Sequence, residues 1–309
     1  MDNLERQLIL ELQAGPRKSS ARLAKDLGVT EYSIRKKINH LASSGRLIFT
    51  ALPDLKRFGY TTGSFFGIKV NKPSSLNTIA EQLCLSPQLH FVARCEGFTD
   101  FFVRGNFKSN DDLANFISGF LGNLEGISHV DTMVELKLIK RNFKVLDTCT
   151  SNVAASPDTD IAIDNVDREL ILELQKDCRV SLKELAQIFN MGKTTMHRRI
   201  KNLISSRIIE LTAIPNMVSL GYVEEFFMGI DTELNGLERV AAAIAKYPQV
   251  GTVGIYSGQT QLVVSVLAAS SNDLITLVNE EISQIPGIKR VDWLISVNVL
   301  KRAFSWLQS

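Results

Sequence analysis

The second half of this sequence repeats the first. The segment Asp2–Gln13 returns 162 positions later as Asp164–Gln175, with most of its residues unchanged. After one deletion the repeat continues at an offset of 161, which relates Gly97 to Gly258. A repeat of about 160 residues has the size of a domain or a pair of domains, whereas solenoid repeats are much shorter. The sequence therefore predicts two copies of one folding unit, a built-in dimer.

The composition is that of a soluble globular protein. Hydrophobic residues make up 45% and charged residues 22% of the 309 positions. No stretch approaches the ~20 apolar residues that a membrane span requires. The first residues, Met1–Glu5, lack the basic and apolar regions of a signal peptide. We therefore expect a cytoplasmic protein that does not bind membranes.

The cysteines and histidines are scattered along the chain. The four cysteines are Cys84, Cys95, Cys149 and Cys178, and they show no metal-ligand spacing. The four histidines form no local cluster with cysteine or glutamate. We expect ordinary reduced thiols, no bound metal and no cofactor.

Each half opens with a pattern of three helices. In the first half the apolar residues of Leu4–Ala14 fall on one helix face, and a short helix follows at Ala21–Leu27. Thr30 can cap a third helix. The buried stripes of the third helices are expected to be Ile34, Ile38 and Leu41 in the first half and Met196, Ile200 and Leu203 in the second. This order predicts helix-turn-helix domains at residues 1–50 and 163–212, each ending in a short strand that a proline terminates.

The remainder of each half alternates strand and helix patterns in the order β-α-β-β-α-β, which is the ferredoxin-like order. These segments cover residues 60–146 and 222–309. Residues 147–162 are rich in Ser, Thr, Asp, Ala and Pro and indicate an extended linker. The predicted fold class is α+β, with two repeats that each join a winged-helix-like helix-turn-helix domain to a ferredoxin-like βαββαβ domain.

The outward face of each third helix is basic and polar. The candidate DNA-contacting residues are Tyr32, Ser33, Arg35, Lys36, Lys37 and Asn39 in the first copy and Lys193, Thr194, Thr195, His197, Arg198, Arg199 and Lys201 in the second. Such a helix can enter the major groove, where Arg, Lys and Asn read base edges and other cations neutralise phosphates. The alternative is an ordinary solvated helix face. Two copies in the same context favour binding to double-stranded DNA.

The distribution of charge supports this interpretation unevenly. The net charge is +5 for residues 1–60 but only +1 for residues 160–222, in a chain whose total is +2. Positive charge is therefore concentrated in the segments that would meet phosphate, mainly in the first.

The turn between the two middle strands of each half is a second candidate site. Gly97 and Asp100 occupy this turn in the first half, and Gly258 and Gln261 occupy it in the second. Spacing alone favours a plain hairpin with glycine in a left-handed conformation. A small-ligand pocket is the functional alternative. The pairs Lys140-Arg141 and Lys301-Arg302 on the last strands are interpreted as solvated strand ends.

These motifs together resemble the Lrp/AsnC (feast/famine) family of transcription regulators, present as a tandem fusion. The resemblance rests on the Asp-x-x-(Asp/Glu)-Arg-x-Leu-Ile-Leu-x-Leu-Gln opening, the third helix with (Arg/Lys)-Ile-x-x-Leu, and the Gly-x-x-Asp turn. It implies DNA-reading domains, sensing domains that pair into dimers, and an amino-acid effector bound between subunits near that turn. Gly97, Asp100 and Gly258 match the effector turn, while Gln261 replaces the second Asp, so the second site is expected to be altered or inactive. Lys37 and Arg199 match the basic position of the family's third helix.

Two alternatives from other functional classes remain at this stage. Siroheme decarboxylases share the two-domain layout, but their His-Asn-Tyr-x-x-Arg-like segment is missing here, where residues 92–96 read Val-Ala-Arg-Cys-Glu. Shared fold alone does not license shared function. The other alternative is a sensor that has lost DNA binding, which the low charge of the second reader leaves open. A non-catalytic regulator that reads asymmetric half-sites is the favoured hypothesis.

Overall fold

The computed structural model of the protein describes residues 2–97, 99–142, 162–217, 224–268, 270–304 and 307. The predicted linker, apart from Ala162, lies outside these residues, as does Cys149. The chain forms two compact units, and each takes one segment from either half of the sequence. The first unit is Met1–Phe58 with Ala155–Gly221 and Phe304–Ser309, and the second is Gly59–Ala154 with Tyr222–Ala303.

The first unit, which we call the reader unit, contains the two three-helix segments, each called a reader because the sequence predicts that it binds DNA. The first segment consists of α1 (Asn3–Ala14), α2 (Ser20–Leu27), α3 (Glu31–Ser43) and β1 (Leu47–Pro53), followed by a 3-10 turn at Leu55–Phe58. The second consists of α6 (Asn165–Lys176), α7 (Leu182–Ile188), α8 (Lys193–Ser205) and β6 (Ile209–Pro215). The predicted stripes of α3 and α8 are buried. The helices therefore form where apolar periodicity and caps predict them.

The turn before each third helix is left-handed. Gly28 has a φ of 66° and its counterpart Asn190 a φ of 48°, as predicted from their tolerance of this conformation. Arg207 also has a positive φ, 53°, at the position that Gly45 holds in the first half. The second third helix thus ends with the same backbone turn as the first, although an arginine is a weaker stop signal than a glycine.

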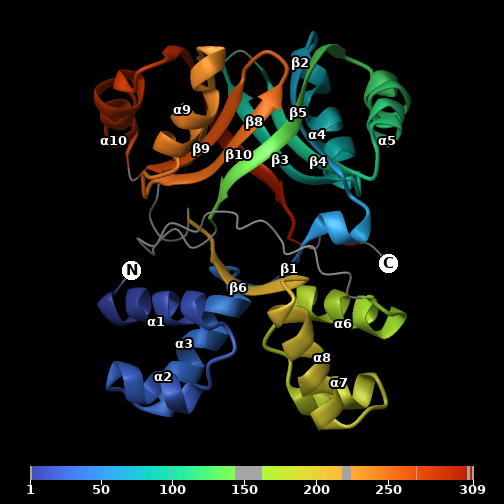
Figure 1. Ribbon diagram of the computed structural model, residues 1–309, viewed down its shortest axis with the longest axis vertical. Coiled ribbons are helices and arrows are strands. Elements are labelled where there is room, and N and C mark those ends of the chain that lie inside the picture. Colours follow the sequence, from blue (N-terminus) through green and yellow to red (C-terminus); the bar gives the residue numbers. More distant parts are fainter. Residues whose placement is uncertain are drawn as a thin grey trace. The chain divides into compact units, whose positions relative to one another are not determined.

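Strands β1 and β6 join the two readers. They pair antiparallel as a two-stranded sheet, with Leu47 opposite Pro215 and Pro53 opposite Ile209. Helix α1 contacts β6 of the other half, and α6 contacts β1 (Figure 1). The buried hydroxyl of Thr50 donates a hydrogen bond of 2.9 Å to the carbonyl of Gln175. The readers therefore share one core, because each packs its first helix on the other's strand.

The second unit, which we call the sensing unit, contains both βαββαβ segments. The first comprises β2 (Thr62–Val70), α4 (Leu76–Leu85), β3 (Leu89–Glu96), β4 (Phe101–Phe107), α5 (Asn110–Asn115, continued by helical turns to Asn123) and β5 (Ile127–Arg141). The second comprises β7 (Glu224–Thr232), α9 (Leu237–Ile244), β8 (Val250–Ser257), β9 (Leu262–Ala268), α10 (Ser271–Thr276, continued to Gln284) and β10 (Ile288–Arg302). The predicted α+β class is confirmed.

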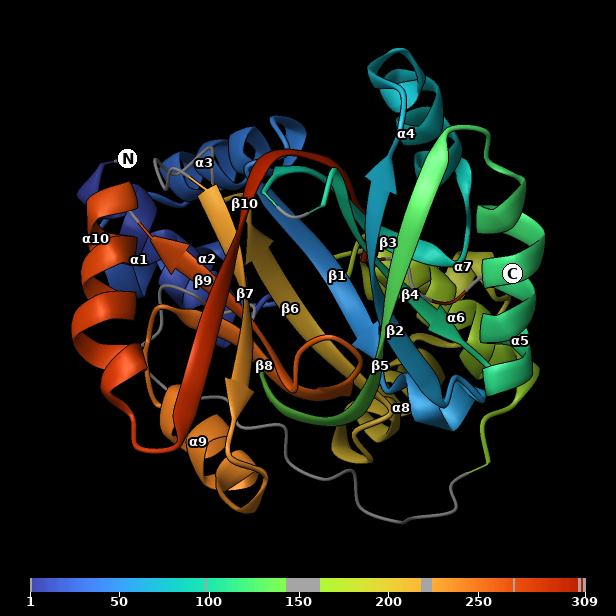
Figure 2. The same ribbon diagram turned by 90° about the horizontal axis from the view of Figure 1, so that it is seen from above.

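The eight strands of the sensing unit close into one barrel in the order β10-β3-β4-β2-β5-β8-β9-β7. The long last strand of each half makes the closure: β5 pairs with β2 and with β8 of the other half, while β10 pairs with β7 and with β3. Figures 1 and 2 show α4 and α5 on one side of the barrel and α9 and α10 on the other. The sensing sheets therefore pair within the chain, a point on which the sequence left alternatives open.

Three apolar clusters hold the sensing unit together. One joins the first sheet to α4 and α5 through residues such as Phe66 and Leu83, and another joins the second sheet to α9 and α10. The third fills the barrel interior with strand residues from both halves, including Phe65, Phe102 and Phe227. The rings of Phe65 and Phe102 stack with centroids 4.7 Å apart. Burial of large aromatic side chains contributed by both halves stabilises the barrel as one body.

The lysines near the ends of β5 and β10 are structural, so their interpretation as solvated strand ends was wrong. Lys140 is 1% exposed and donates 2.9 Å to the carbonyl of Tyr247, just after α9. Lys301 occupies the equivalent position and donates 2.8 Å to the carbonyl of Ser86, which caps α4. Each lysine thus binds the carboxyl end of a helix from the other half, where the helix dipole favours a cation. Strand pairing across the halves creates this environment, which local sequence does not reveal.

Candidate nucleic-acid interface and effector cavity

The outward faces of α3 and α8 lie in the reader unit as the sequence predicts. The exposed candidates are Tyr32, Arg35, Lys36 and Asn39 on α3 and Lys193, Thr194, His197, Arg198 and Lys201 on α8. Ser33, Lys37, Thr195 and Arg199 are half-buried. Tyr32 is 77% exposed, which is unusual for a large aromatic side chain and places it where it can contact a partner. Arg35 forms an ion pair of 2.5 Å with Glu31 one turn earlier.

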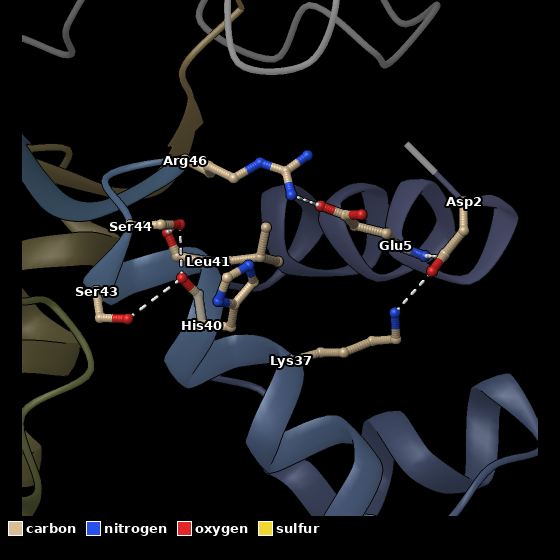
Figure 3. Close-up of polar contacts among 8 residues, drawn as sticks. All are labelled: Asp2, Glu5, Lys37, His40, Leu41, Ser43, Ser44 and Arg46. Atoms are coloured by element: carbon tan, nitrogen blue, oxygen red, sulfur yellow. Dashed lines mark hydrogen bonds and ion pairs between the residues drawn. The ribbon is translucent and has the colours of Figure 1, made fainter.

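Lys37 points to the start of α1 and away from the exposed face. Its Nζ donates 2.8 Å to the Asp2 carboxylate, which also caps α1 by accepting from the amide of Glu5 (Figure 3). The hydrogen bond from Lys37 is the main reason that the pKa of Asp2 lies below its ordinary value. Arg46 pairs with Glu5 at 2.8 Å nearby. The Lys37 side chain therefore braces α3 against α1.

Arg199 has the same role in the second reader. Its guanidinium donates to Asp164 at 2.9 Å and to Asp167 at 2.7 Å, at the start of α6. The Asp167 amide also binds Asp164, and these contacts lower the pKa of Asp164. The two basic residues that match the family's third-helix position are thus both engaged with the first helix of their own reader.

The hairpin turns of the sensing unit carry a matched pair of side-chain contacts. The Asp100 carboxylate accepts 2.7 Å from the amide of Val70 at the end of β2. The Gln261 side-chain oxygen accepts 2.6 Å from the amide of Thr232 at the end of β7. Aspartate and glutamine therefore satisfy the same backbone group in the two halves. The carboxylate of Asp100 has, in addition, Lys69 Nζ at 3.4 Å.

The glycines of these turns lie against the opposite half of the barrel. Gly97 and Gly258 have φ values of 129° and 142°, which favour glycine. A Cβ on Gly258 would lie 2.9 Å from the carbonyl oxygen of Thr132 on β5, whereas one on Gly97 would lie 3.6 Å from that of Trp293 on β10. Both glycines thus serve the closure of the barrel, and Gly258 has the tighter fit.

A cavity of about 470 Å³ opens beside the second hairpin. Its apolar wall combines residues of both halves, Phe102 and Met133 with Phe227, Met228 and Val263. Its polar lining is Gln259, Thr260, Arg290 and Asp292. Arg290 pairs with Asp292 at 2.9 Å and with Asp231 at 3.2 Å. Gly97, Asp100 and Gly258, the residues that the sequence suggests for the effector, do not line this cavity, although Gly258 directly precedes Gln259.

A buried polar cluster inside the barrel escaped sequence reasoning. Arg104 on β4 donates 2.6 Å to Glu135 on β5, which also accepts 3.1 Å from the hydroxyl of Tyr256 on β8. Burial raises the pKa of Tyr256. Burial, together with the Arg104 guanidinium, lowers the pKa of His90 well below its ordinary value. Strand alternation could have indicated this cluster, because residues two apart in a strand face the same side. Arg104 is two residues after the inward-facing Phe102, and Glu135 is two residues after the inward-facing Met133.

The described residues hold no group of three or more His, Cys, Asp or Glu side chains that would suit a metal ion. Cys84, Cys95 and Cys178 are free thiols, and burial raises the pKa of Cys95 and of Cys178 to about 12 in each case. A buried thiol that stays protonated is a poor nucleophile. None of the described helices is long and apolar enough to cross a membrane.

Comparison with known proteins identifies the class. The sequence model of the Lrp/AsnC ligand binding domain matches residues 64–145 and again 225–306, and that of the AsnC-type helix-turn-helix domain matches residues 163–204. An HTH-type transcriptional regulator named FL11 from Pyrococcus abyssi is 31% identical over 142 residues, which cover 46% of this chain and 93% of that protein. An uncharacterised HTH-type transcriptional regulator of Pyrococcus horikoshii is 27% identical over 146 residues, 47% of this chain and 92% of that protein.

Among solved structures, a siroheme decarboxylase determined alone and in complex with an iron-uroporphyrin III analogue matches nearly the whole chain. The siroheme decarboxylase NirDL covers 97% of this chain and 93% of its own, with a TM-score of 0.67 and 14% sequence identity. At this identity the match shows a shared fold, not a shared activity.

The helix-turn-helix segment and the sensing barrel define a transcriptional regulator with a DNA-reading domain and ligand-binding domains. The chain belongs to the Lrp/AsnC family, whose ligand-binding domain it carries twice.

Proposed function

We propose that this chain is a sequence-specific DNA-binding regulator in which both readers, residues 1–50 and 163–212, bind double-stranded DNA. The supporting observation is the pair of exposed basic helices, α3 and α8, that one shared sheet holds in a single unit. Paired helix-turn-helix readers contact two half-sites about one DNA turn apart. In this proposal one chain supplies both readers, and residues 60–146 and 222–309 are its sensing domains.

The two readers would recognise different half-sites. The first turns of the third helices present Tyr32 and Ser33 in one reader and Thr194 and Thr195 in the other, followed by Arg35-Lys36 and His197-Arg198. Side chains at the start of a recognition helix contact base edges, so different residues select different bases. An asymmetric operator follows from fusing two readers that have diverged.

The test of this proposal is to measure binding to genomic DNA fragments at two salt concentrations. The fragments include the upstream region of the protein's own gene. Substituting both Arg35 and Lys36 by Ala should weaken binding and make its salt dependence shallower by about two phosphate contacts. The matched control replaces Lys246 and Lys289, which are exposed on the sensing unit, and removes the same charge. Absence of specific complexes at low salt would favour a sensor without DNA binding.

We further propose that the cavity beside the second hairpin holds the effector, and that this effector is an amino acid with an apolar side chain. Arg290 and Asp292 lie 2.9 Å apart in its lining, so they can pair with a carboxylate and an ammonium group. The wall of Phe102, Met133 and Phe227 suits an apolar side chain. Because both halves of the barrel contribute to the cavity, a ligand bound there would affect how the two halves pack against each other. In this proposal the effector lies at the second hairpin, whereas the sequence alone led us to expect that the second site is altered or inactive.

Calorimetric titration with individual amino acids tests the effector site. Asp292→Asn should weaken binding of an apolar amino acid about tenfold, because the charge partner of the ammonium group is lost. Asp131→Asn, the counterpart in the first half, where Asp131 pairs with His129, serves as the matched control. Equal affinities in the wild type and Asp292→Asn would move the effector site elsewhere.

We propose that the chain is not an enzyme. The chain shares its fold with the siroheme decarboxylase NirDL, so this activity is the enzymatic alternative. However, residues 92–96 and 253–257 contain no His-Asn-Tyr segment. Absorbance of a tetrapyrrole in the purified protein, or decarboxylation of added siroheme, would support the enzyme instead. Self-association through the ferredoxin-like domains is a further expectation, and light scattering can measure it.

A further inference from the structure

An apolar crevice lies beside the recognition helix of the second reader. It has a volume of about 370 Å³, within the ~300–1,000 Å³ of small-molecule sites. Leu182 at the start of α7 and Ile200 and Ile204 on α8 supply its apolar surface. Ile204 is 40% exposed. Exposure of an apolar isoleucine side chain to water is unfavourable.

The ionisable side chains that line this crevice are all basic ones. Arg17, His197 and Lys201 belong to the lining, and no acidic residue does. His197, Lys201 and Ile204 follow one another at i, i+4 and i+7, so they share one face of α8. Arg17 comes from the first reader, and its guanidinium donates 2.8 and 2.9 Å to the carbonyls of Cys178 and Val180, which keep it beside Leu182.

The first reader lacks the residues that make the crevice. At the equivalent positions it has Ser20 in place of Leu182, Ala42 in place of Ile204 and Asn39 in place of Lys201. Two apolar side chains and the cation at position 201 thus distinguish the second reader on this face, while the first reader has Arg35 in place of His197. The folding of the first reader shows that the smaller residues are compatible with the same helices, so the crevice is not required for the three-helix fold.

We infer that this crevice binds an amphipathic anion, a small carboxylate with an apolar body. The apolar body would lie against Leu182, Ile200 and Ile204, and the carboxylate would face the cationic groups of Lys201 and Arg17. Burial of the ligand's apolar surface supplies the affinity, and the basic residues of the lining select the charge. The site is separate from the effector cavity, which lies in the sensing unit. It would let a second class of small molecule act on the second reader directly.

Titration of the full chain with decanoate, followed through isoleucine methyl resonances, tests this inference without DNA. The methyl groups of Ile200 and Ile204 should shift with decanoate concentration. Leu182→Ser and Lys201→Asn, which install the residues of the first reader, should each weaken decanoate binding about fivefold to tenfold. Lys201→Asn should leave the binding of the neutral decan-1-ol unchanged.

Ile188→Ala is the matched control, because Ile188 is 53% exposed on α7 and does not line the crevice. It should bind decanoate as the wild type does. Unmoved Ile200 and Ile204 resonances at saturating decanoate, or equal affinities in the wild type, Leu182→Ser and Lys201→Asn, would overturn the inference. Methyl resonances of Ile9 and Ile171, which are buried in the reader unit and do not line the crevice, report whether each variant is folded. Since no step uses DNA, the result is independent of whether the readers bind it.

Discussion

Arg17 and Arg179 each donate hydrogen bonds to backbone carbonyls in the opposite half of the chain. Arg17 donates hydrogen bonds of 2.8 and 2.9 Å to the carbonyls of Cys178 and Val180. Arg179, 162 positions later, donates 2.5 and 3.3 Å to those of Pro16 and Lys18, the equivalent residues. The contact is therefore reciprocal and fixes the two readers as a pseudo-symmetric pair.

Arg17→Ala should destabilise the protein by about 1–3 kcal/mol, because it removes charge-assisted hydrogen bonds to two carbonyls. Arg17→Lys should recover only part of this free energy, since an ammonium group lacks the planar fork that reaches both carbonyls. Urea unfolding of the full chain measures both. Arg22→Ala, which removes an exposed ion pair with Asp26, should change the free energy of unfolding by about 0.5 kcal/mol or less.

Asp100→Gln should leave the stability of the sensing unit nearly unchanged, whereas Asp100→Ala should lower it by about 1–2 kcal/mol. The reason is that Gln261 already satisfies the Thr232 amide as Asp100 satisfies that of Val70. Thermal unfolding compares the two variants. If Asp100→Gln unfolds as easily as Asp100→Ala, the carboxylate itself is required and a role beyond binding this amide must be sought.

Gly258→Ala should destabilise the barrel more than Gly97→Ala. Both substitutions place a side chain at positive φ, which costs on the order of 1 kcal/mol. Gly258→Ala adds a clash, since its Cβ would lie 2.9 Å from the Thr132 oxygen, while the nearest atom to a Cβ on Gly97 is 3.6 Å away. Denaturant midpoints of the two variants give the order, and a reversed order would show that the barrel relaxes at β5.

Acid should destabilise the protein through His90. Burial and Arg104 lower its pKa well below 6.5 in the folded state, so below that pH the unfolded chain binds more protons than the folded protein. The free energy of unfolding therefore falls as the pH drops from 7.5 through 6.5, by at most about 1.4 kcal/mol per pH unit for one such group. His90→Gln does not titrate and should show a shallower slope. Lys108→Gln, an exposed substitution, should keep the wild-type slope.

Giving α3 the exposed residues of α8 should convert the preferred operator into a palindrome. The substitutions are Glu31→Lys, Tyr32→Thr, Ser33→Thr, Arg35→His, Lys36→Arg and Asn39→Lys. The first turns of the two helices would then present the same exposed side chains to two half-sites. Selection from random DNA should return asymmetric sites for the wild type and symmetric ones for this variant. Palindromes selected by the wild type would contradict the proposed asymmetry.

The candidate site was predictable in part. The exposed faces of α3 and α8 follow from the apolar stripes on their opposite sides, because a helix that buries Ile34 and Ile38 must turn Arg35 and Lys36 outward. The ion pair between Lys37 and Asp2 was not predictable, since helix periodicity does not say which other helix lies next to the Lys37 side of α3. The cavity beside the second hairpin was missed because Phe102 and Arg290 belong to different halves.

The sequence by itself determined the kind and order of the elements. Caps such as Thr30, left-handed positions such as Gly28 and periodic apolar residues are local properties, and local properties set helices and strands. Only the tertiary structure decided which strands pair. Alternation along β5 is the same whether its partner is β8 of this chain or a strand of another, so the barrel and the burial of Lys140, bound to a residue 107 positions away, depend on long-range packing.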